Sequence, residues 1–384
     1  MPSSPITTIV EHFSEVEDPR AAHRITHQLI EIIAITLCAV ICGAESWIEI
    51  AAYGRAKEEW LQQWLSLEGG IPSHDTFENV FARLKPEALQ QSFFNWVNAI
   101  CQCGEGRLIA LDGKTLRAAY ERDGQRSMIH MISAWASQNR MVLAQRKVDE
   151  KSNEITAMPE LLQALELEGA LVSIDAMGCQ RNIAATIIKQ GGDYVLALKG
   201  NQGDLHTDVV QLFEHAQRTD FRGIEHDCYQ KSEKGHGRIE QRTYWTMANT
   251  DYLLGAENWA GLQSIGCVES RRCFPGAVEQ LERRYYLLSI ESDAQRFAEA
   301  VRNHWSIENQ LHWVLDVAFR EDEMRACRGY CAENLAVMRH MAVNLLQQET
   351  TAKGGVKARR LQAGWNDNYL FKVLMAGNAA VPKL

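Results

Sequence analysis

The chain has 384 residues, of which 46% are hydrophobic and 23% charged, and its formal net charge is −9. This composition excludes a largely disordered chain and a small disulfide scaffold, and the length allows two domains. The acidic balance argues mildly against a nucleic-acid partner, because DNA favours a basic surface, although carboxylates around bound cations would account for part of it.

The amino-terminal part, residues 1–104, is predicted to be an all-α domain. Its apolar run at residues 29–43 contains Glu31 and is too short to span a bilayer, so we expect a buried helix and no membrane partner. After Gly69-Gly70 and Pro72, Ser73 is a good N-cap for the next helix. This pattern resembles a helix-turn-helix that could bind DNA ends, and a helical bundle without DNA contact fits it equally.

Two further features concern the cellular compartment. The start of the chain lacks the basic and apolar parts of a signal peptide. The ten cysteines are irregularly spaced, which is typical of reduced, mostly buried thiols. We therefore expect a cytoplasmic protein.

Residues 105–348 follow a different pattern, which predicts an α/β domain. Short apolar runs end at Asp112 and Asp175, and a hairpin turn is expected at residues 138–140. Strands and helices then alternate, which indicates a mixed sheet with flanking helices. Residues 220–290 alternate like strands and are predicted to be a β-rich insertion.

Helices are expected again towards the end of the chain. The first covers residues 294–313 and the second about residues 332–347. The remainder, residues 349–384, is predicted to be a less regular tail.

Asp112 and Asp175 are the most informative residues of the α/β part. A carboxylate at the end of a buried strand is costly unless it is paired or binds a metal. If the two strands are neighbours, both side chains point into one crevice, and a divalent cation would relieve their repulsion. The alternative is that each aspartate only caps the turn that follows it.

A third acid is expected from the helix that contains His304, Glu308 and His312, which are four residues apart and share one face. A partly buried polar stripe bonded to nearby loops is the alternative interpretation. Other acids follow closely and compete for the same role: Asp316, Glu321 and Asp322.

Long, ordered motifs in this chain resemble the H-repeat-associated group of bacterial insertion-sequence transposases, which have an Asp-Asp-Glu (DDE) active site. The resemblance covers roughly residues 6–348. The segments that resemble the group's catalytic motifs are IALDGKT around Asp112, residues 175–202, the GHGRIEQR segment at 235–242, and residues 304–322. The segments that resemble its amino-terminal associated domain are residues 17–20, 42–47 and 72–77.

The resemblance implies a ribonuclease-H-like fold with a β-rich insertion and a catalytic, metal-binding trio of Asp112, Asp175 and Glu308. It also implies cleavage of double-stranded DNA at element ends and strand transfer to target DNA. Three carboxylates suit two Mg²⁺ or Mn²⁺ ions about 3.5–4 Å apart. A homo-oligomer is expected when two ends are joined, and the nucleoid is the expected location.

The supporting residues expected around Glu308 are His304, His312 and Asn309. Related transposase groups have Tyr, Arg and Lys near the third acid, where this chain has Val301, His304 and Leu315. The roles of the two histidines therefore cannot be copied from those groups.

Several polar or basic residues are predicted to contact DNA from positions near strands. Lys114 follows Asp112, and a polar loop follows the strand that precedes Lys199. The predicted contacts are Lys114, Lys199, Asn201, Arg238 and Arg242, each with a solvated side chain as the alternative.

Two rival functions remain open from the sequence. A zinc hydrolase could use His304, Glu308 and His312, although three ligands on successive turns of one helix do not easily close around a tetrahedral ion. A catalytically inactive DNA-binding relic of a transposase is the other, and the presence of all three acids argues against simple loss of the site.

Overall fold

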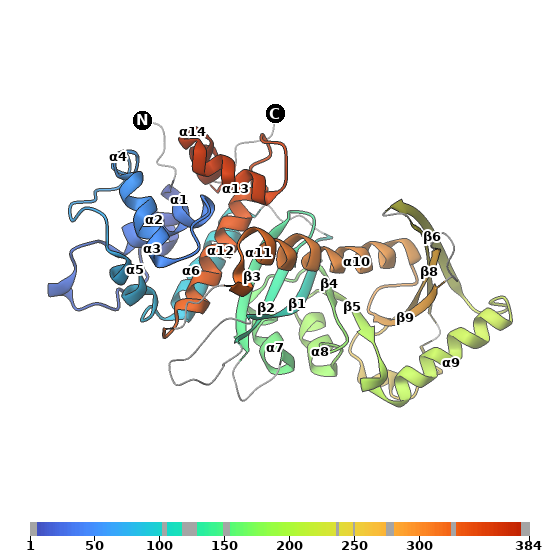
Figure 1. Ribbon diagram of the computed structural model, residues 1–384. Coiled ribbons are helices and arrows are strands. Elements are labelled where there is room, and N and C mark those ends of the chain that lie inside the picture. Colours follow the sequence, from blue (N-terminus) through green and yellow to red (C-terminus); the bar gives the residue numbers. More distant parts are fainter. Residues whose placement is uncertain are drawn as a thin grey trace. The chain divides into compact units, whose positions relative to one another are not determined.

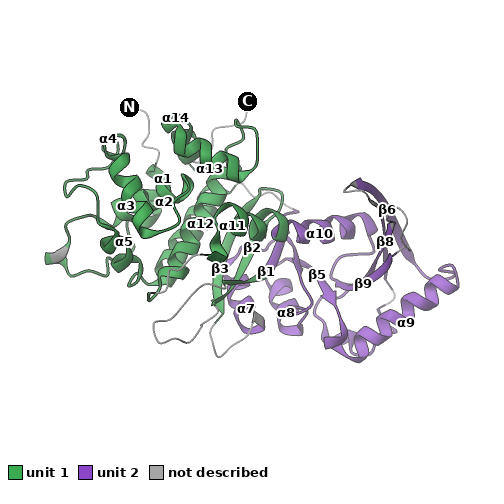
Figure 2. Ribbon diagram, viewed as in Figure 1, with its two compact units in different colours: residues 1–103, 113–150, 308–384 green, residues 104–112, 151–307 purple. Residues whose placement is uncertain are grey.

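The computed structural model describes residues 6–101, 106–116, 129–148, 154–235, 238–248, 250–273, 280–323 and 328–377. The chain forms two compact units, each made of separate stretches of sequence (Figure 2). Unit 1 comprises residues 1–103, 113–150 and 308–384, and unit 2 comprises residues 104–112 and 151–307. Two of the four boundaries fall within or at the end of an element: one after Asp112, inside strand β1, and one after Ile307, at the end of helix α10.

Unit 1 is mainly helical, and its helices come from both ends of the chain (Figure 1). From the amino-terminal part come η1 (Ala22–Arg24), α1 (Thr7–Phe13), α2 (Leu29–Ile41), α3 (Trp47–Ala56), α4 (Glu58–Leu61), α5 (His74–Phe81) and α6 (Pro86–Ile100). From the carboxyl-terminal part come α11 (Trp313–Ala318), η5 (Glu321–Glu323), α12 (Cys331–Gln348), α13 (Val356–Trp365) and α14 (Asp367–Met375). The predicted helical amino-terminal region is confirmed.

Helix α2 forms the centre of unit 1 because it is apolar on nearly all sides. It packs against α12, which also contacts α6 and β3. Its one buried acid, Glu31, closes a capping box at the helix start and accepts a hydrogen bond from the Leu67 amide at 2.8 Å. The predicted N-cap at Ser73 is also confirmed, since its hydroxyl accepts a hydrogen bond from the Thr76 amide.

Unit 1 also contains a β-hairpin of β2 (Ile129–Ala136) and β3 (Met141–Val148), paired antiparallel. Its turn lies at the predicted residues, and Arg140 there has a φ of 52°, in the left-handed region. The strands are ordered β3-β2-β1, where β1 spans Leu108–Leu116.

Unit 2 is built on a mixed sheet in the order β1-β4-β5-β9-β8-β7-β6. The strands β1, β4 (Leu171–Ile174) and β5 (Asp193–Leu198) are parallel. The strands β9 (Gln280–Leu288), β8 (Ser264–Cys273), β7 (Arg238–Met247) and β6 (His226–Gly235) continue antiparallel. The predicted α/β fold with a mixed sheet and a β-rich insertion is confirmed, although β6 was not predicted.

Helices flank this sheet within unit 2. They are α7 (Glu154–Ala164), α8 (Arg181–Lys189), α9 (Asp204–Arg218) and α10 (Ala294–Ile307), with short η2 (Gly200–Gln202) and η3 (Ala256–Asn258) turns between strands. Helix α10 packs against β4, β5, β6 and β7, whereas α8 packs against β5 and α7.

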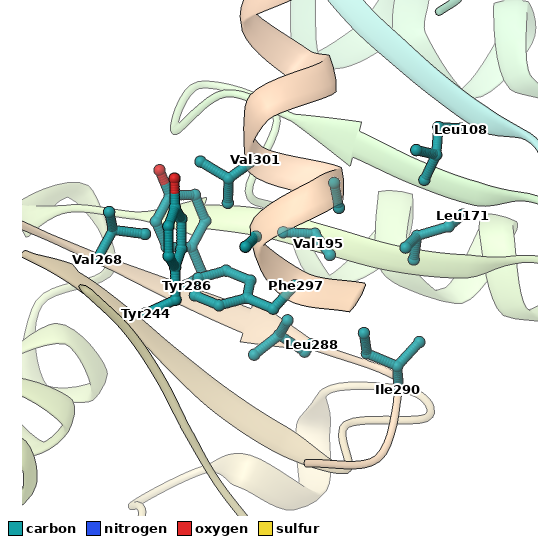
Figure 3. Close-up of a cluster of buried hydrophobic side chains, with 12 residues drawn as sticks. Leu108, Leu171, Val195, Tyr244, Val268, Tyr286, Leu288, Ile290, Phe297 and Val301 are labelled. Carbon is teal, nitrogen blue, oxygen red and sulfur yellow. The ribbon is translucent and has the colours of Figure 1, made fainter. Parts of the chain in front are cut away.

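The core of unit 2 lies where α10 meets the sheet. Figure 3 shows Phe297 among the side chains of Tyr244, Tyr286 and Leu288. The Phe297 ring makes edge-to-face contacts with both tyrosine rings, at a centroid distance of 6.0 Å and an angle of 84° to Tyr244, and at 5.1 Å and 69° to Tyr286. Farther along the same face, Val195, Leu171 and Leu108 extend this cluster.

Three expectations need correction. The segment after residue 349 is not irregular, since it forms α13 and α14. The helix expected over residues 294–313 is interrupted by a π-helical turn, η4 (Glu308–His312). The cysteines are not all reduced, because Cys101 is disulfide-bonded.

None of the described helices is long and apolar enough to cross a membrane.

Phe297→Ala should destabilise unit 2. The ring is fully buried between α10 and the sheet, so its removal should leave a cavity and lower the free energy of unfolding by about 3–5 kcal/mol. Urea unfolding followed by circular dichroism measures this. A loss below about 1 kcal/mol would contradict the packing described for α10.

Candidate active site

In unit 2, Asp112 and Asp175 lie where the parallel pairing of β1 with β4 ends. Asp175 directly follows β4, whereas Asp112 lies inside β1, which continues to Leu116. The register pairs Leu111 with Ile174, so each aspartate is the next residue along its strand direction. Both side chains are half-buried. The sheet topology therefore brings together the two aspartates that the sequence singled out, and their negative charges repel at this edge.

Asp175 also caps the turn that follows it. Its Oδ1 accepts hydrogen bonds from the backbone amides of Met177, at 3.1 Å, and Gly178, at 3.3 Å. The turn-capping interpretation is thus correct for Asp175. It does not exclude a metal-binding role, because both of these bonds use the same carboxylate oxygen.

The loop after β5 lies against this turn. Lys199 is exposed, while the side-chain amides of the next two polar residues are bonded. Asn201 Nδ2 donates to the Ala176 carbonyl at 2.8 Å, and Gln202 Nε2 donates to the Cys179 carbonyl at 2.6 Å. The sequence indicated a polar loop here but not these contacts, which depend on the adjacency of β4 and β5.

The last turns of α10 lie against the same strands. The ring of His304 places Nδ1 3.3 Å from the Ser173 hydroxyl. Ser173 is buried on β4, two residues before Asp175, and was not predicted as a site residue. His304 is half-buried, so it lies at the edge of the core.

In unit 1, Glu308 and His312 lie at the two ends of the π-helical turn. Nδ1 of His312 donates to Oε2 of Glu308 at 3.0 Å. The Glu308 side chain is 57% exposed, whereas that of His312 is only 5% exposed. Burial lowers the pKa of His312, although the bond to Glu308 acts in the opposite direction, and a neutral ring that donates from Nδ1 fits this geometry. Asn309 is exposed in the same turn.

Lys114 is held inside unit 1 by acidic side chains. Its Nζ lies 2.5 Å from Asp316 Oδ1 and 2.8 Å from Glu321 Oε2, and its side chain is 10% exposed. Burial alone would lower the pKa of Lys114, but the charges of Glu321 and Asp316 outweigh it and raise that pKa. The predicted DNA contact of Lys114 stays a prediction that this geometry does not favour.

Glu321 is the centre of this buried network. Arg339, on α12, lies 3.5 Å from its other oxygen, and both side chains are almost fully buried. Burial would raise the pKa of Glu321, but the positive charges of Lys114 and Arg339 lower it to about 2. The carboxylate is therefore a fixed structural anion within unit 1.

Two of the predicted DNA contacts, Arg238 and Arg242, lie in the β-rich insertion. Arg242 forms ion pairs with Glu233, at 2.9 Å, and Glu240, at 2.7 Å, and is 18% exposed. Arg238 begins β7, but its side chain lies outside the described residues. Other arginines of the insertion also pair with glutamates: Arg271, Arg272, Arg283 and Arg284.

Comparison with known families identifies the class of protein. The family described as "Transposase DDE domain" matches residues 104–345, and the one described as "DDE_Tnp_1-associated" matches residues 10–97. The chain therefore belongs to the DDE-domain transposase family, as its motifs predicted.

Relatives of similar length agree with this assignment. The Escherichia coli K12 protein named "H repeat-associated putative transposase YhhI" is 40% identical over 370 residues, which cover 95% of this chain and 97% of the relative. "Putative transposase YncI" of Escherichia coli O157:H7 is 38% identical over 373 residues, covering 96% and 95%. A Xanthobacter autotrophicus protein is 44% identical over 284 residues, covering 73% and 94%.

Glu321→Gln should destabilise unit 1, because it leaves buried Arg339 without its anionic partner. We expect a loss of about 3–5 kcal/mol at pH 7, measured by urea unfolding. The pKa of Glu321 is lower in the folded protein than its ordinary value of 4.5. Its contribution is therefore complete above pH 4.5 and is lost as the pH falls towards 2.

The difference in stability between wild type and Glu321→Gln should accordingly be smaller at pH 3 than at pH 7. Glu323→Gln is the matched control, since Glu323 is exposed in the same 3₁₀ turn. A constant difference at both pH values would contradict the ionised, buried state of Glu321.

Proposed function

We propose that this protein is an active insertion-sequence transposase that cleaves DNA phosphodiesters at element ends and transfers the cut strand to target DNA. The observation that supports this most strongly is that Asp112 and Asp175 directly follow the last paired residues of the parallel strands β1 and β4, in a chain of the DDE-domain family. Asp112, Asp175 and Glu308 are the proposed catalytic acids.

The chain path around α10 supports Glu308 as the third acid. His304 lies against Ser173, two residues before Asp175. Glu308 follows one helical turn after His304, directly behind the last residue of α10. Helix interruptions by a π-helical turn are frequent at functional sites, because they change the direction in which side chains project.

The chemistry of the donors fits a divalent cation. Asp112, Asp175 and Glu308 each carry a carboxylate and His312 carries a ring nitrogen, which are atoms that can bind a metal ion. Carboxylate-rich sets favour Mg²⁺ or Mn²⁺. Two such ions, when bound, would supply Lewis-acid stabilisation of the attacking and leaving oxygens of the phosphodiester.

The protein's own residues would orient the reactants. His312 holds Glu308 through its Nδ1 proton, so the glutamate carboxylate keeps one orientation although it is largely exposed. Lys199, exposed at the end of β5, is the proposed contact for a DNA phosphate. We propose that at least two copies of the chain act together when two DNA ends are joined.

A zinc hydrolase is not supported. Within the part of the chain that the structure describes, His304 is not among the side chains grouped for metal binding, and its Nδ1 lies beside Ser173. The Nδ1 of His312 is engaged by Glu308. Neither histidine therefore presents that atom to a shared zinc ion.

Replacing any of the three acids should abolish cutting. Asp112→Asn, Asp175→Asn and Glu308→Gln should each reduce Mg²⁺- or Mn²⁺-dependent cleavage of an element-end duplex at least about a hundredfold, since each removes a charge that neutralises the ions. Cleavage is measured on labelled duplex, with DNA binding and far-ultraviolet circular dichroism as controls. Normal cutting by any folded variant would remove that residue from the site, and no cutting by folded, DNA-binding wild type would indicate an inactive relic.

Lys199→Met should weaken DNA binding without affecting the metal requirement. Loss of one phosphate contact should reduce the salt dependence of log Kd by about one unit and weaken binding equally for specific and unrelated sequences. Fluorescence anisotropy over a range of salt concentrations measures this. An unchanged salt slope would show that Lys199 is only a solvated side chain.

A further inference from the structure

The loop that begins at Asp175 has a tightly constrained shape. We call residues 175–180, between β4 and α8, the Asp175 loop. Asp175 itself bonds the amides of Met177 and Gly178. A Cβ on Gly178 would lie 2.2 Å from Ile174 Cγ2 and 2.7 Å from Met158 Sδ, so only glycine fits where the loop passes over these side chains.

Two side chains of the segment that follows β5 form hydrogen bonds with the Asp175 loop. Asn201 donates to the Ala176 carbonyl, and Gln202 donates to the Cys179 carbonyl. Because a carbonyl can only accept, the amide nitrogens and not the oxygens must face the loop. The two bonds hold the loop at its first and fourth residues after Asp175, and thus at both ends of the turn.

The segment that supplies these bonds is itself anchored. It follows β5, which is paired in register with β4. The backbone N–H of Gln202 donates to the Lys199 carbonyl at 3.0 Å, and the backbone N–H of Gly203 donates to the Gly200 carbonyl at 3.1 Å. Gly203 then takes a φ of 51°, in the left-handed region, before α9 begins. Asn201 and Gln202 therefore project from a folded 3₁₀ turn rather than from an extended loop.

We propose that Asn201 and Gln202 are positioning residues for Asp175, which hold its loop so that the carboxylate keeps a metal-binding orientation. This inference rests on the proposed function for the role of Asp175. It also gives Asn201 a role other than the DNA contact predicted from the sequence. Lys199, two residues earlier and exposed, remains the proposed DNA contact. Neighbouring residues of one loop would thus have two roles, one in DNA binding and one in positioning Asp175.

The geometry at Asp175 explains why such positioning matters. Its Oδ1 is occupied by two backbone amides, so the direction of Oδ2 is fixed by the shape of the loop. A metal ligand must be held to within about 0.5 Å of its working position by the groups around it. If the loop loosened, the carboxylate would still be present, but it would bind the ion less tightly.

Hydrogen–deuterium exchange of the full-length, metal-free protein tests the contacts directly. The variants are Asn201→Leu and Gln202→Met, which keep the side-chain volume but remove the donor, and their double variant. Peptides that cover residues 175–182 should exchange about two- to tenfold faster in each single variant, and faster still in the double variant. Lys199→Met is the matched control and should exchange like wild type. If residues 175–182 of the double variant exchanged at the wild-type rate, the proposal would be overturned.

Metal binding tests the purpose of these contacts. Mn²⁺ affinity is measured by electron paramagnetic resonance, and the Mn²⁺ dependence of cutting is measured at saturating DNA. In the variants we expect about a three- to tenfold weaker Mn²⁺ affinity and a matching rise in half-saturating Mn²⁺, with cutting partly restored at high Mn²⁺. DNA affinity and its salt dependence should stay at wild-type values.

The outcomes separate this inference from the proposed function. Wild-type protein that binds Mn²⁺ and cuts DNA, with a double variant of unchanged Mn²⁺ dependence, would overturn the positioning role alone. Variants that lose DNA affinity and salt dependence instead would establish a DNA contact and overturn it too. Wild-type protein that neither binds Mn²⁺ nor cuts DNA would overturn the proposed function, and with it the purpose assigned to Asn201 and Gln202.

Discussion

The in-register parallel pairing of β1 with β4 is the constraint on which the candidate site of unit 2 depends. Leu111 and Ile174, the last paired residues, are buried, and each is followed by an aspartate, so the pairing places two carboxylates at the point where it ends. Such an arrangement is unfavourable unless hydrogen bonds or a cation compensate the charges. Backbone amides compensate one oxygen of Asp175, and a divalent ion is the partner proposed for its other oxygen.

Several positive charges of this chain pair with acidic side chains of the same chain. Lys114 and Arg339 neutralise Glu321, and the arginines of the β-rich insertion pair with its glutamates. A basic residue near a strand in the sequence is therefore not by itself evidence of a DNA contact, as the buried Lys114 shows. The buried pairs are poor evidence for added stability, because desolvation offsets much of their attraction, but removing one partner is costly.

Sequence patterns predicted the features that depend on neighbouring residues, and they missed the features that depend on residues far away in the sequence. The end of β4 before Asp175, the Ser73 cap and the hairpin turn follow from short-range rules, and the motifs added the family. The strand end predicted at Asp112 was wrong, because β1 continues to Leu116. Strand β6 is a polar edge strand with little alternation of apolar residues, so hydrophobic periodicity did not predict it. The ion pair between Lys114 and Glu321 joins residues 207 positions apart, which no pattern along the chain encodes. The two units are similarly discontinuous in sequence.

Asp175 shows why the choice between a structural and a catalytic role was too narrow. A carboxylate has two oxygens, and here one of them closes a turn while the geometry of that turn directs the other. In the proposed site, this structural bond would lower the entropic cost of metal binding, since a freely rotating side chain would lose entropy when it bound an ion. The same reasoning applies to His312, whose buried ring holds the carboxylate of the exposed Glu308 through the hydrogen bond from Nδ1. In both cases, a hydrogen bond within the protein orients a carboxylate of the proposed metal site.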